Sequence, residues 1–460
     1  MIEEITQNNL DQSKSEVKTQ SEMPKSSSNK KIIAFLFILF ILITGIMGAF
    51  LVKQYRFPEV IPVPTTMPTP NAELSPAPYI LEASPSMQLS QAHNYFGFNI
   101  FHQLLNEDKG KNIFISPLSI HLALSMTYNG ADSTTKEAMA KTLQIQQMDI
   151  NQLNKDSSAL IDLLQNPDPK VEILIANSIW MGIGENFNPD FLTANQTYYK
   201  AKLDSLDFND PKSADIINSW VSNNTKGKIP TIIIPPIPPD MVMYLINAVY
   251  FKGNWTVEFD KKLTTERLFT LTDGSQKEYP MMQQKGNFLY FENDQFQSVN
   301  IPYGKNKRLG MHVFLPKGNL ENFTNELSIE NWKKWLTEYK EKEGTIILPK
   351  YKIEYKKNLN DVLKSLGMAV AFSSQADFSR MRENPKLKDL YISEVIHKTY
   401  VDVNEEGTEA AAVTEVGMAK TVAIQEKKTF YMEINRPFYF AIADNQTSEI
   451  LFMGIILEPK

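Results

Sequence analysis

The sequence predicts an α+β domain over residues 89–460, preceded by a polar, an apolar and a proline-rich segment. Two observations predict this arrangement. Within 89–460, patterns typical of amphipathic helices alternate with runs rich in Val, Ile, Tyr and Phe that are typical of strands. Before residue 89, the composition changes sharply at residues 32 and 53. The chain has 460 residues, 42% of them apolar, which is enough for a large core.

The three leading segments predict a membrane anchor. Residues 1–31 are polar and lack apolar periodicity, so we expect a disordered cytoplasmic head. Residues 32–52 are uncharged and would form a helix about 31 Å long, close to the roughly 30 Å hydrocarbon core. A signal peptide would need a shorter apolar region and an Ala-x-Ala-like site. Lysines precede this segment and few cations follow it, which favours a transmembrane helix with the domain outside the cell.

Residues 53–88 contain most of the prolines that precede the domain. Eight prolines lie between residues 57 and 86. Proline fixes φ and favours extended chain, so we expect a semi-rigid stalk. The sequence therefore predicts a single-pass membrane protein with an extracellular domain on a stalk.

Helix signals open the domain. The first helix is expected to bury one apolar face, formed by Phe96, Ile100, Phe101, Leu104 and Leu105. A second helix is expected to begin at Ser116-Pro117 and to end at Asn129-Gly130. The residues 134–137 resemble a capping box at the start of a third helix.

Strand signals dominate the rest of the domain. Branched and aromatic residues are concentrated in 171–181, 241–253, 308–316, 344–355, 395–403 and 429–444. The proline-rich segment 230–240 is compatible both with a loop and with a domain boundary.

Composition excludes several function classes. The chain has no cysteine, so disulfides, thiolate metal sites and cysteine nucleophiles are excluded. Its five histidines show no HxxxH spacing, and we expect no metal and no cofactor. A net charge of −6 argues against nucleic-acid binding. The motifs GxSxG, HExxH and GxxxxGK[ST] are absent, so we expect no enzyme.

The segment between the last two strand runs, about 404–428, is long for a connection inside a compact domain. Its alanines are also compatible with a short helix. From Thr408, however, the even positions to Met418 are small or apolar, whereas Glu409 and Glu415 occupy odd positions. Because side chains alternate in an extended chain, the segment is compatible with a strand whose even face is buried.

At this point the sequence resembles the serpins, serine-protease inhibitors that act by a conformational trap. The similarity lies in several blocks that fall in serpin order: 112–120, 245–255, 396–412 and 432–442. It covers residues 89–460 and makes 230–240 a loop inside one domain. We therefore expect a membrane-anchored bacterial serpin.

The resemblance implies three sheets, eight or nine helices and an exposed reactive loop at about 404–428. A serine protease, trypsin-like or elastase-like, would attack this loop as a substrate. The cleaved loop would then insert into the main sheet and strand the covalent acyl-enzyme. We expect the inhibitor to act as a monomer.

The resemblance also assigns residues to roles. The hinge of the loop would comprise Glu405, Glu406, Gly407, Thr408, Glu409, Ala410, Ala411 and Ala412. The region where the sheet opens would comprise Ser116, Ser119, Asn247, Trp255 and His397. For Ser116 and Ser119, simple helix capping remains open. A hydrogen-bonded core imidazole is expected at His397, rather than a metal ligand or a general base.

Two adjacent peptide bonds remain possible as the reactive bond. Counting seventeen residues from Glu405 places the cut between Thr421 and Val422, which suits elastase-like proteases. A cut one residue earlier would follow Lys420 and suit trypsin-like proteases with an acid in the pocket. Lys427 and Lys428 are possible further cleavage sites.

A non-inhibitory binding or carrier protein of the same fold is the alternative. Such proteins typically have a charged or bulky residue at the position of Thr408, which this chain lacks.

Overall fold

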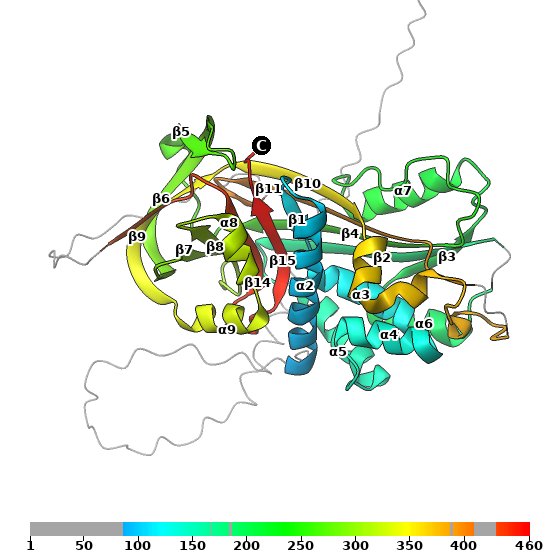
Figure 1. Ribbon diagram of the computed structural model, residues 1–460. Helices are drawn as coiled ribbons and strands as arrows, with labels where there is room; N and C mark the ends of the chain where they lie inside the picture. Colours follow the sequence, from blue (N-terminus) through cyan, green and yellow to red (C-terminus); the bar gives the residue numbers. More distant parts are fainter. Residues whose placement is uncertain (1–85, 166, 184–185, 387–389, 409–428) are drawn as a thin grey trace, which may run out of the picture. The chain divides into compact units, whose positions relative to one another are not determined.

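A computed structural model describes residues 86–165, 167–183, 186–386, 390–408 and 429–460. Element labels follow Figure 1. Residues Ile80–Lys460 form one unit, and the proline-rich segment 230–240 is a loop inside it.

The described residues contain nine α-helices and four shorter helical turns. The helices are α2 (Met87–Glu107), α3 (Pro117–Tyr128), α4 (Ser133–Leu143), α5 (Ile150–Gln165), α6 (Pro189–Tyr199), α7 (Ser213–Asn224), α8 (Leu320–Asn325), α9 (Ile329–Thr337) and α10 (Asn360–Leu363). The turns are η1 (Lys261–Leu263), η2 (Lys364–Met368), η3 (Ala369–Phe372) and η4 (Ser379–Met381).

Two hydrogen-bonded sheets carry the described strands. A nine-stranded sheet contains β1 (Ile113–Ile115), β5 (Thr265–Thr270), β6 (Gln276–Glu292), β7 (Phe296–Pro302), β8 (Leu309–Pro316), β9 (Lys340–Pro349), β13 (Phe430–Glu433), β14 (Phe438–Asp444) and β15 (Ile450–Ile456). A six-stranded sheet contains β2 (Val171–Gly182), β3 (Lys202–Leu206), β4 (Met243–Asn254), β10 (Tyr351–Asn358), β11 (Glu394–Asn404) and β12 (Gly407–Thr408).

Within the described residues the strands form two hydrogen-bonded sheets, whereas the resemblance implied three. The nine-stranded sheet has the strand order β1-β15-β14-β8-β7-β6-β9-β13, with β5 paired to β6. The 17-residue strand β6 pairs with β5, β7 and β9, and it joins the two halves by continuous hydrogen bonding. The expected α+β fold is confirmed.

Both faces of the central strand β4 in the six-stranded sheet are buried, whereas the edge strand β10 exposes one face. In β4, Tyr244, Ile246 and Ala248 pack with α7 and the loop that follows it. The intervening residues, such as Leu245 and Val249, pack into the main core. Figure 1 shows α7 on one side of this sheet and α3 to α6 on the other. The nearly continuous apolar run of β4 follows from burial on both faces.

Helix ends mostly follow the sequence signals. Ser116 caps α3 and Asn129 is its last flanking residue, as predicted. The third predicted helix begins earlier than the capping-box pattern suggests: α4 starts at Ser133, and Asp132 caps it by accepting a hydrogen bond from the Ser133 N–H. The carboxylate of Asp132 is also fixed by Arg380, a contact that the local sequence does not show.

Prolines divide two of the predicted strand runs. The run 344–355 contributes to β9, which ends at Pro349, and to β10 in the other sheet. The run 429–444 is divided between β13 and β14, with Pro437 just before β14. Proline cannot donate a ladder hydrogen bond, so each strand ends or begins there.

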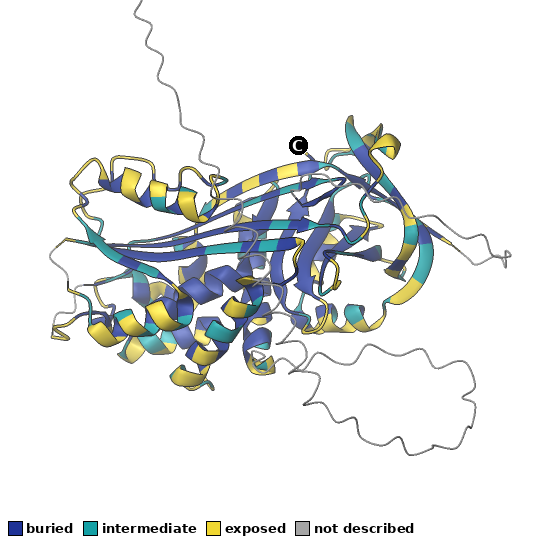
Figure 2. Ribbon diagram, turned by 180° about the vertical axis from the view of Figure 1, so that it is seen from behind, coloured by how far each residue is buried: buried dark blue, intermediate teal, exposed yellow. Residues whose placement is uncertain are grey.

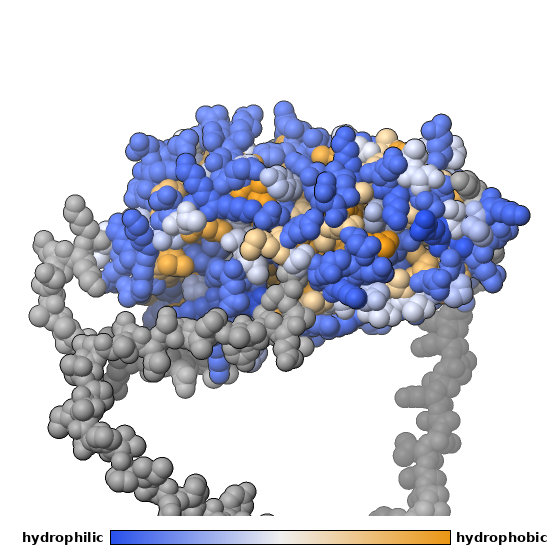
Figure 3. Space-filling view, turned by 90° about the horizontal axis from the view of Figure 1, so that it is seen from below, coloured by the Kyte–Doolittle hydropathy of each residue, from blue (hydrophilic) through white to orange (hydrophobic). Residues whose placement is uncertain are grey.

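The burial pattern agrees with a well-packed core. Figure 2 shows buried central strands and helices whose outer faces are exposed. On the face drawn in Figure 3, hydrophilic residues predominate and apolar residues form small separate patches. Of the predicted apolar face of α2, four residues are fully buried and Leu105 is half-buried.

The expected single-pass membrane localisation is contradicted. Among the residues that the structure describes, no helix is both long and apolar enough to cross a bilayer. The longest described helix, α2, has 21 residues but contains Gln, Asn and His at many positions. Segments 1–31 and 32–52 and most of 53–88 lie outside the described residues.

Candidate functional site

The candidate site lies where β4 and β11 meet in the six-stranded sheet. Residues 244–250 of β4 pair in parallel with residues 394–400 of β11. We call this pairing the β4–β11 seam. Beyond Tyr250 and Tyr400 the two strands are no longer paired with each other. The sheet is therefore closed along the seam and open at one end.

The two-residue strand β12, Gly407–Thr408, occupies the open end. It pairs antiparallel with both neighbours: Thr408 lies opposite Val403 of β11 and opposite Gly253 of β4. Two residues of the predicted hinge are thus already hydrogen-bonded between the two strands.

Gly407 lies directly against the backbone of β4. Its φ is +153°, a conformation that favours glycine. A Cβ at this position would lie 2.1 Å from the carbonyl oxygen of Gly253 and 2.5 Å from the Cα of Asn254. Only glycine allows the hinge to approach β4 this closely.

Thr408 is completely buried at the end of β12. Its Oγ1 is 2.8 Å from the hydroxyl of Tyr303, and the Tyr303 ring stacks on Trp255 with centroids 4.4 Å apart. The position therefore accepts a small side chain that can hydrogen-bond, as the alternation of the sequence indicated for the even face.

Trp255 anchors the chain just before β12. Its indole N–H donates to the carbonyl of Asn404 (2.9 Å), and its backbone N–H donates to the carbonyl of Glu406 (3.0 Å). The side chain is fully buried. Trp255 thus fixes both the end of β11 and the turn into the hinge.

Two hinge carboxylates are tied to neighbouring elements. Glu405 pairs with Lys350 at 2.9 Å and accepts a hydrogen bond from the hydroxyl of Thr264 at 2.8 Å. Partial burial opposes ionisation of Glu405, but the Lys350 and Thr264 hydrogen bonds outweigh it and lower its pKa. Glu406 forms an ion pair with Lys261.

A row of buried polar side chains crosses the seam. Asn177 of β2 lies opposite Asn247 of β4, which lies opposite His397 of β11. In-register residues of neighbouring strands point to the same face, so the three side chains form one row. The N-terminal end of α3 covers this row with Ser116 and Ser119.

Hydrogen bonds fix the tautomer of His397. The backbone N–H of Ser116 donates to Nε2 (3.2 Å), so Nε2 carries no proton. The proton is on Nδ1, which donates to Oδ1 of Asn247 (2.6 Å). The amide of Asn247 donates in turn to Oδ1 of Asn177 (2.6 Å) and to the carbonyl of Ser119 (3.1 Å).

Burial lowers the pKa of His397 to about 3, so the imidazole is neutral at physiological pH. With both nitrogens engaged, it has no free lone pair for a metal or a substrate proton. Among the residues that the structure describes, no cluster of His, Asp and Glu forms a candidate metal site. This histidine therefore belongs to a hydrogen-bonded core network.

Ser116 caps α3 and also bonds to the second sheet. Its hydroxyl accepts from the backbone N–H of Ser119 (3.3 Å) and so caps α3. The same hydroxyl donates to the carbonyl of Leu451 in β15 (2.7 Å). The serine thus joins the helix cap under the seam to the second sheet.

The structure brings together Ser116, Ser119, Asn247 and His397, and separately joins Trp255 to the hinge residues Glu405 to Thr408. Glu409 to Ala412 and the reactive-bond candidates Lys420, Thr421 and Val422 lie outside the described residues, as do Lys427 and Lys428.

Sequence reasoning missed several partners of these residues. Asn177 is the one asparagine in an apolar strand run, a signal that could have identified it. Tyr303, Lys350 and Lys261 carry no local signal, because they reach the hinge from positions 55 to 145 residues away in the chain.

Comparison with known proteins identifies the family. The family model described as "Serpin (serine protease inhibitor)" matches residues 91–459. The leukocyte elastase inhibitor of horse (Equus caballus) is 34% identical over 386 residues, covering 81% of this chain and 100% of the relative. A serpin-like protein of the archaeon Methanosarcina mazei is 34% identical over 380 residues, covering 81% of this chain and 88% of the relative.

Solved structures show the same similarity. The native state of the thermophilic serpin tengpin has a TM-score of 0.74 and 35% identity, covering 82% of this chain and 96% of that chain. Human thyroxine-binding globulin in complex with its ligand has a TM-score of 0.74 and 29% identity, covering 81% and 99%. The horse and Methanosarcina relatives are mammalian and archaeal, so they do not support the expected bacterial source. The chain belongs to the serpin family of serine protease inhibitors.

Proposed function

We propose that this chain is an irreversible suicide-substrate inhibitor of serine-type endopeptidases. Cleavage within about 404–428 would allow the loop to insert between β4 and β11, so that the protease stays covalently attached. The chain would act as a monomer, without a cofactor and without catalytic turnover. The observation that carries the proposal is β12, which is already paired with both strands at the open end of the sheet.

The geometry of β12 explains why further insertion would be favourable. Along the seam, one parallel ladder joins β4 to β11. A strand inserted in the direction of β12 would be antiparallel to both neighbours. One parallel ladder would thereby be replaced by two antiparallel ladders, and antiparallel pairing is slightly more stable per residue. Cleavage would remove the connection that holds the loop outside the sheet.

The polar row sets the resistance to insertion. Opening the seam separates Asn247 from His397 and breaks their 2.6 Å hydrogen bond. A buried polar group that loses its partner costs about 1–3 kcal/mol. The row therefore keeps the intact sheet closed until cleavage frees enough chain to form the new ladders.

The covalent step follows ordinary serine-protease chemistry. The protease serine oxygen attacks the carbonyl carbon of Lys420 or Thr421, the peptide C–N bond breaks, and the amine of the following residue leaves with a proton. The acyl-enzyme ester links the protease to the new carboxyl end of the loop. Insertion would then strand this ester before water hydrolyses it.

Incubation of the protein with a trypsin-like and an elastase-like protease tests the proposal. We expect SDS-stable adducts with the summed mass of protease and cleaved inhibitor. Mass spectrometry of the released carboxyl-terminal fragment identifies the bond that is cut, since a start at Thr421 indicates cleavage after Lys420 and a start at Val422 indicates cleavage after Thr421.

Lys420→Ala should abolish the adduct with the trypsin-like protease and preserve the adduct with the elastase-like protease. Loop cleavage by every protease without any adduct would refute the proposal.

A non-inhibitory carrier of the same fold is the second candidate, favoured by the similarity to the thyroxine-binding globulin structure. The small, uncharged Thr408 argues against it, because its burial between two strands is compatible with insertion. Cleavage that yields only free protease and a cut chain would favour the carrier.

A further inference from the structure

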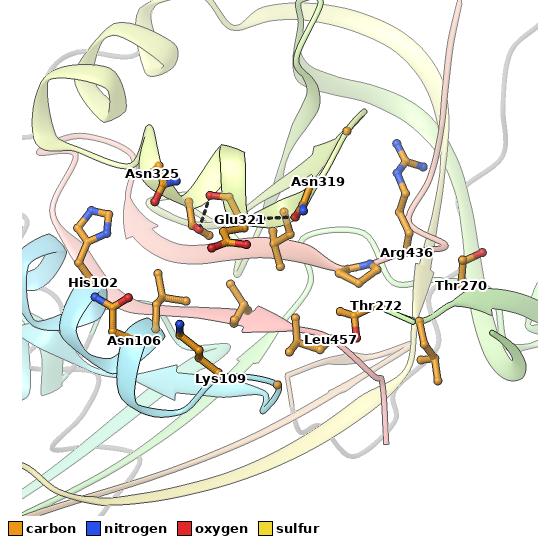
Figure 4. A pocket seen from close by; sticks show the side chains of 18 residues that line it. His102, Asn106, Lys109, Thr270, Thr272, Asn319, Glu321, Asn325, Arg436 and Leu457 are labelled. Atoms are coloured by element: carbon orange, nitrogen blue, oxygen red, sulfur yellow. Dashed lines mark hydrogen bonds between the residues drawn. The ribbon is translucent and has the colours of Figure 1, made fainter. Parts of the chain in front are cut away.

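A cavity of about 760 Å³ lies between α2, α8, the start of β14 and the end of β15, and no residue of the seam lines it. Figure 4 shows His102 and Asn106 of α2, with Lys109 from the turn after it, on one side and Asn319, Glu321 and Asn325 on the other. Arg436 and the end of β5 close one end of the cavity. Its volume is within the range of about 300–1,000 Å³ typical of small-molecule sites.

The wall of the cavity is apolar and incompletely covered. Leu105, Leu271, Leu320 and Leu457 line it, and each packs against the core with only part of its side chain buried. They come from four separate segments of the chain. These half-exposed leucines leave apolar surface of the cavity in contact with water. An apolar ligand would cover that surface and release the water.

Positive charge predominates among the residues around the cavity. Lys109 and Arg436 contribute cations and Glu321 contributes one carboxylate. Arg436 is half-buried and donates only to uncharged oxygens, those of Pro316 (2.8 Å) and Asn435 (3.2 Å). Within the part of the chain that the structure describes, neither cation has a carboxylate partner. A single anionic group on a ligand would complement this excess of charge.

His102 adds a polar group with a defined proton. Its Nε2 must donate to the carbonyl oxygen of Leu327 (2.8 Å), because a carbonyl only accepts. That bond fixes the ring at the cavity wall. The site thus combines an apolar wall, a fixed imidazole and two uncompensated cations.

We propose that this cavity binds a small amphipathic monocarboxylate, with its aliphatic chain against the four leucines and its carboxylate near Lys109. The proposal does not depend on protease inhibition, because no residue of the seam or the hinge lines the cavity.

Calorimetric titration of the full chain with dodecanoate tests this proposal. A neutral ether derived from dodecanol, with the same chain length, serves as the uncharged probe. We expect saturable binding of dodecanoate and weaker binding of the neutral probe. Lys109→Gln should weaken dodecanoate binding about two- to five-fold, the effect of one exposed ion pair. Glu321→Gln should strengthen it by a similar factor, since a repulsive charge is removed.

Two further variants separate this cavity from other apolar surfaces of the chain. Leu320→Asp should reduce dodecanoate binding at least ten-fold, because it places a carboxylate on the apolar wall. Lys111→Gln is the matched control: Lys111 lies near Lys109 but pairs with Asp108 and does not line the cavity, so binding should not change. Circular dichroism checks that each variant is folded. Absence of saturable binding, or binding unaffected by Lys109→Gln or by Leu320→Asp, would overturn the proposal.

Discussion

The two ends of the contact between β4 and β11 are held by different chemistry. Along the seam, the strands pair directly, and neutral buried side chains of Asn247 and His397 join them. At the open end, Gly407 allows close backbone contact between β12 and β4, and ion pairs hold the hinge from outside. The difference suggests a division of roles: glycine and backbone allow insertion to begin, whereas the buried polar row resists its progress.

The largest expected effect comes from placing a charge at the open end. Thr408→Arg would bury a guanidinium that has no partner in the sheet, at a cost of several kcal/mol. We expect the loop still to be cut but at least tenfold less protease to be trapped per cut chain, as measured by the ratio of adduct to cleaved inhibitor on SDS gels. Thr408→Ser keeps the hydroxyl and should trap normally. Equal trapping by the arginine variant would refute insertion at β12.

Removing the centre of the polar row should have the next largest effect. Asn247→Ala would leave Nδ1–H of His397 and Oδ1 of Asn177 without partners. We expect a loss of about 3 kcal/mol in the free energy of unfolding, measured from the first urea transition. Asn224→Ala, at an exposed asparagine bonded to a helix carbonyl, is the control and should change stability by less than about 0.5 kcal/mol. Similar losses in the free energy of unfolding for both variants would show that the polar row stabilises the fold no more than a surface asparagine does.

Acid should weaken the seam before it affects the open end. His397 has a pKa of about 3 in the folded protein, against about 6.5 when unfolded. Between these values only the unfolded chain binds the proton, so the stabilising effect is complete above about pH 6.5 and falls with decreasing pH. The expected slope is about 1.4 kcal/mol per pH unit from this histidine. His397→Gln should remove that part of the slope between pH 6.5 and 5; an unchanged slope would show that this histidine is not the group responsible.

A methyl group at the open end should have a smaller effect. Gly407→Ala would place Cβ 2.1 Å from the Gly253 carbonyl oxygen and force β12 away from β4. We expect a cost of about 1–3 kcal/mol, shown by faster hydrogen exchange of the Thr408 amide. Gly318→Ala is the control, because a Cβ there meets no atom within 4 Å. Unchanged exchange at Thr408 would contradict the close contact.

The smallest expected effect is at the hinge ion pair. Lys350→Gln removes the cationic partner of Glu405; because the ammonium of Lys350 is partly exposed, we expect this pair to contribute about 1 kcal/mol. Hydrogen exchange at the hinge should accelerate slightly at low salt, and the difference from the parent should shrink as salt is added. Lys352→Gln, which removes a pair with Asp402 farther from the hinge, should leave hinge exchange unchanged. An effect independent of salt would exclude this electrostatic explanation.

The sequence was informative where a local pattern carries the information. The apolar run of β4 and the Ser-Pro start of α3 were predicted from spacing and capping alone. The association of Ser116, Ser119, Asn247 and His397 came from the family resemblance, because nothing in the local sequence indicates that residues 128 and 281 positions apart meet.

Other features could not be predicted because they depend on tertiary contacts. The cap at Asp132 is fixed partly by Arg380, and Tyr303 meets Thr408 across more than a hundred residues. The membrane prediction rested on hydropathy in residues 32–52, and no helix among the described residues supports it. The spacing of residue types along the chain predicts helices and strands. The side chains that hold the hinge in the six-stranded sheet follow only from the packed fold.

Thermal unfolding before and after a single cut in the loop tests the central claim most directly. If the cleaved loop inserts between β4 and β11, the cut chain gains two ladders of hydrogen bonds and its Tm should rise above that of the intact chain. The cut Thr408→Arg variant should show no such rise. A Tm that stays the same or falls after cleavage of the parent protein would contradict insertion into the six-stranded sheet.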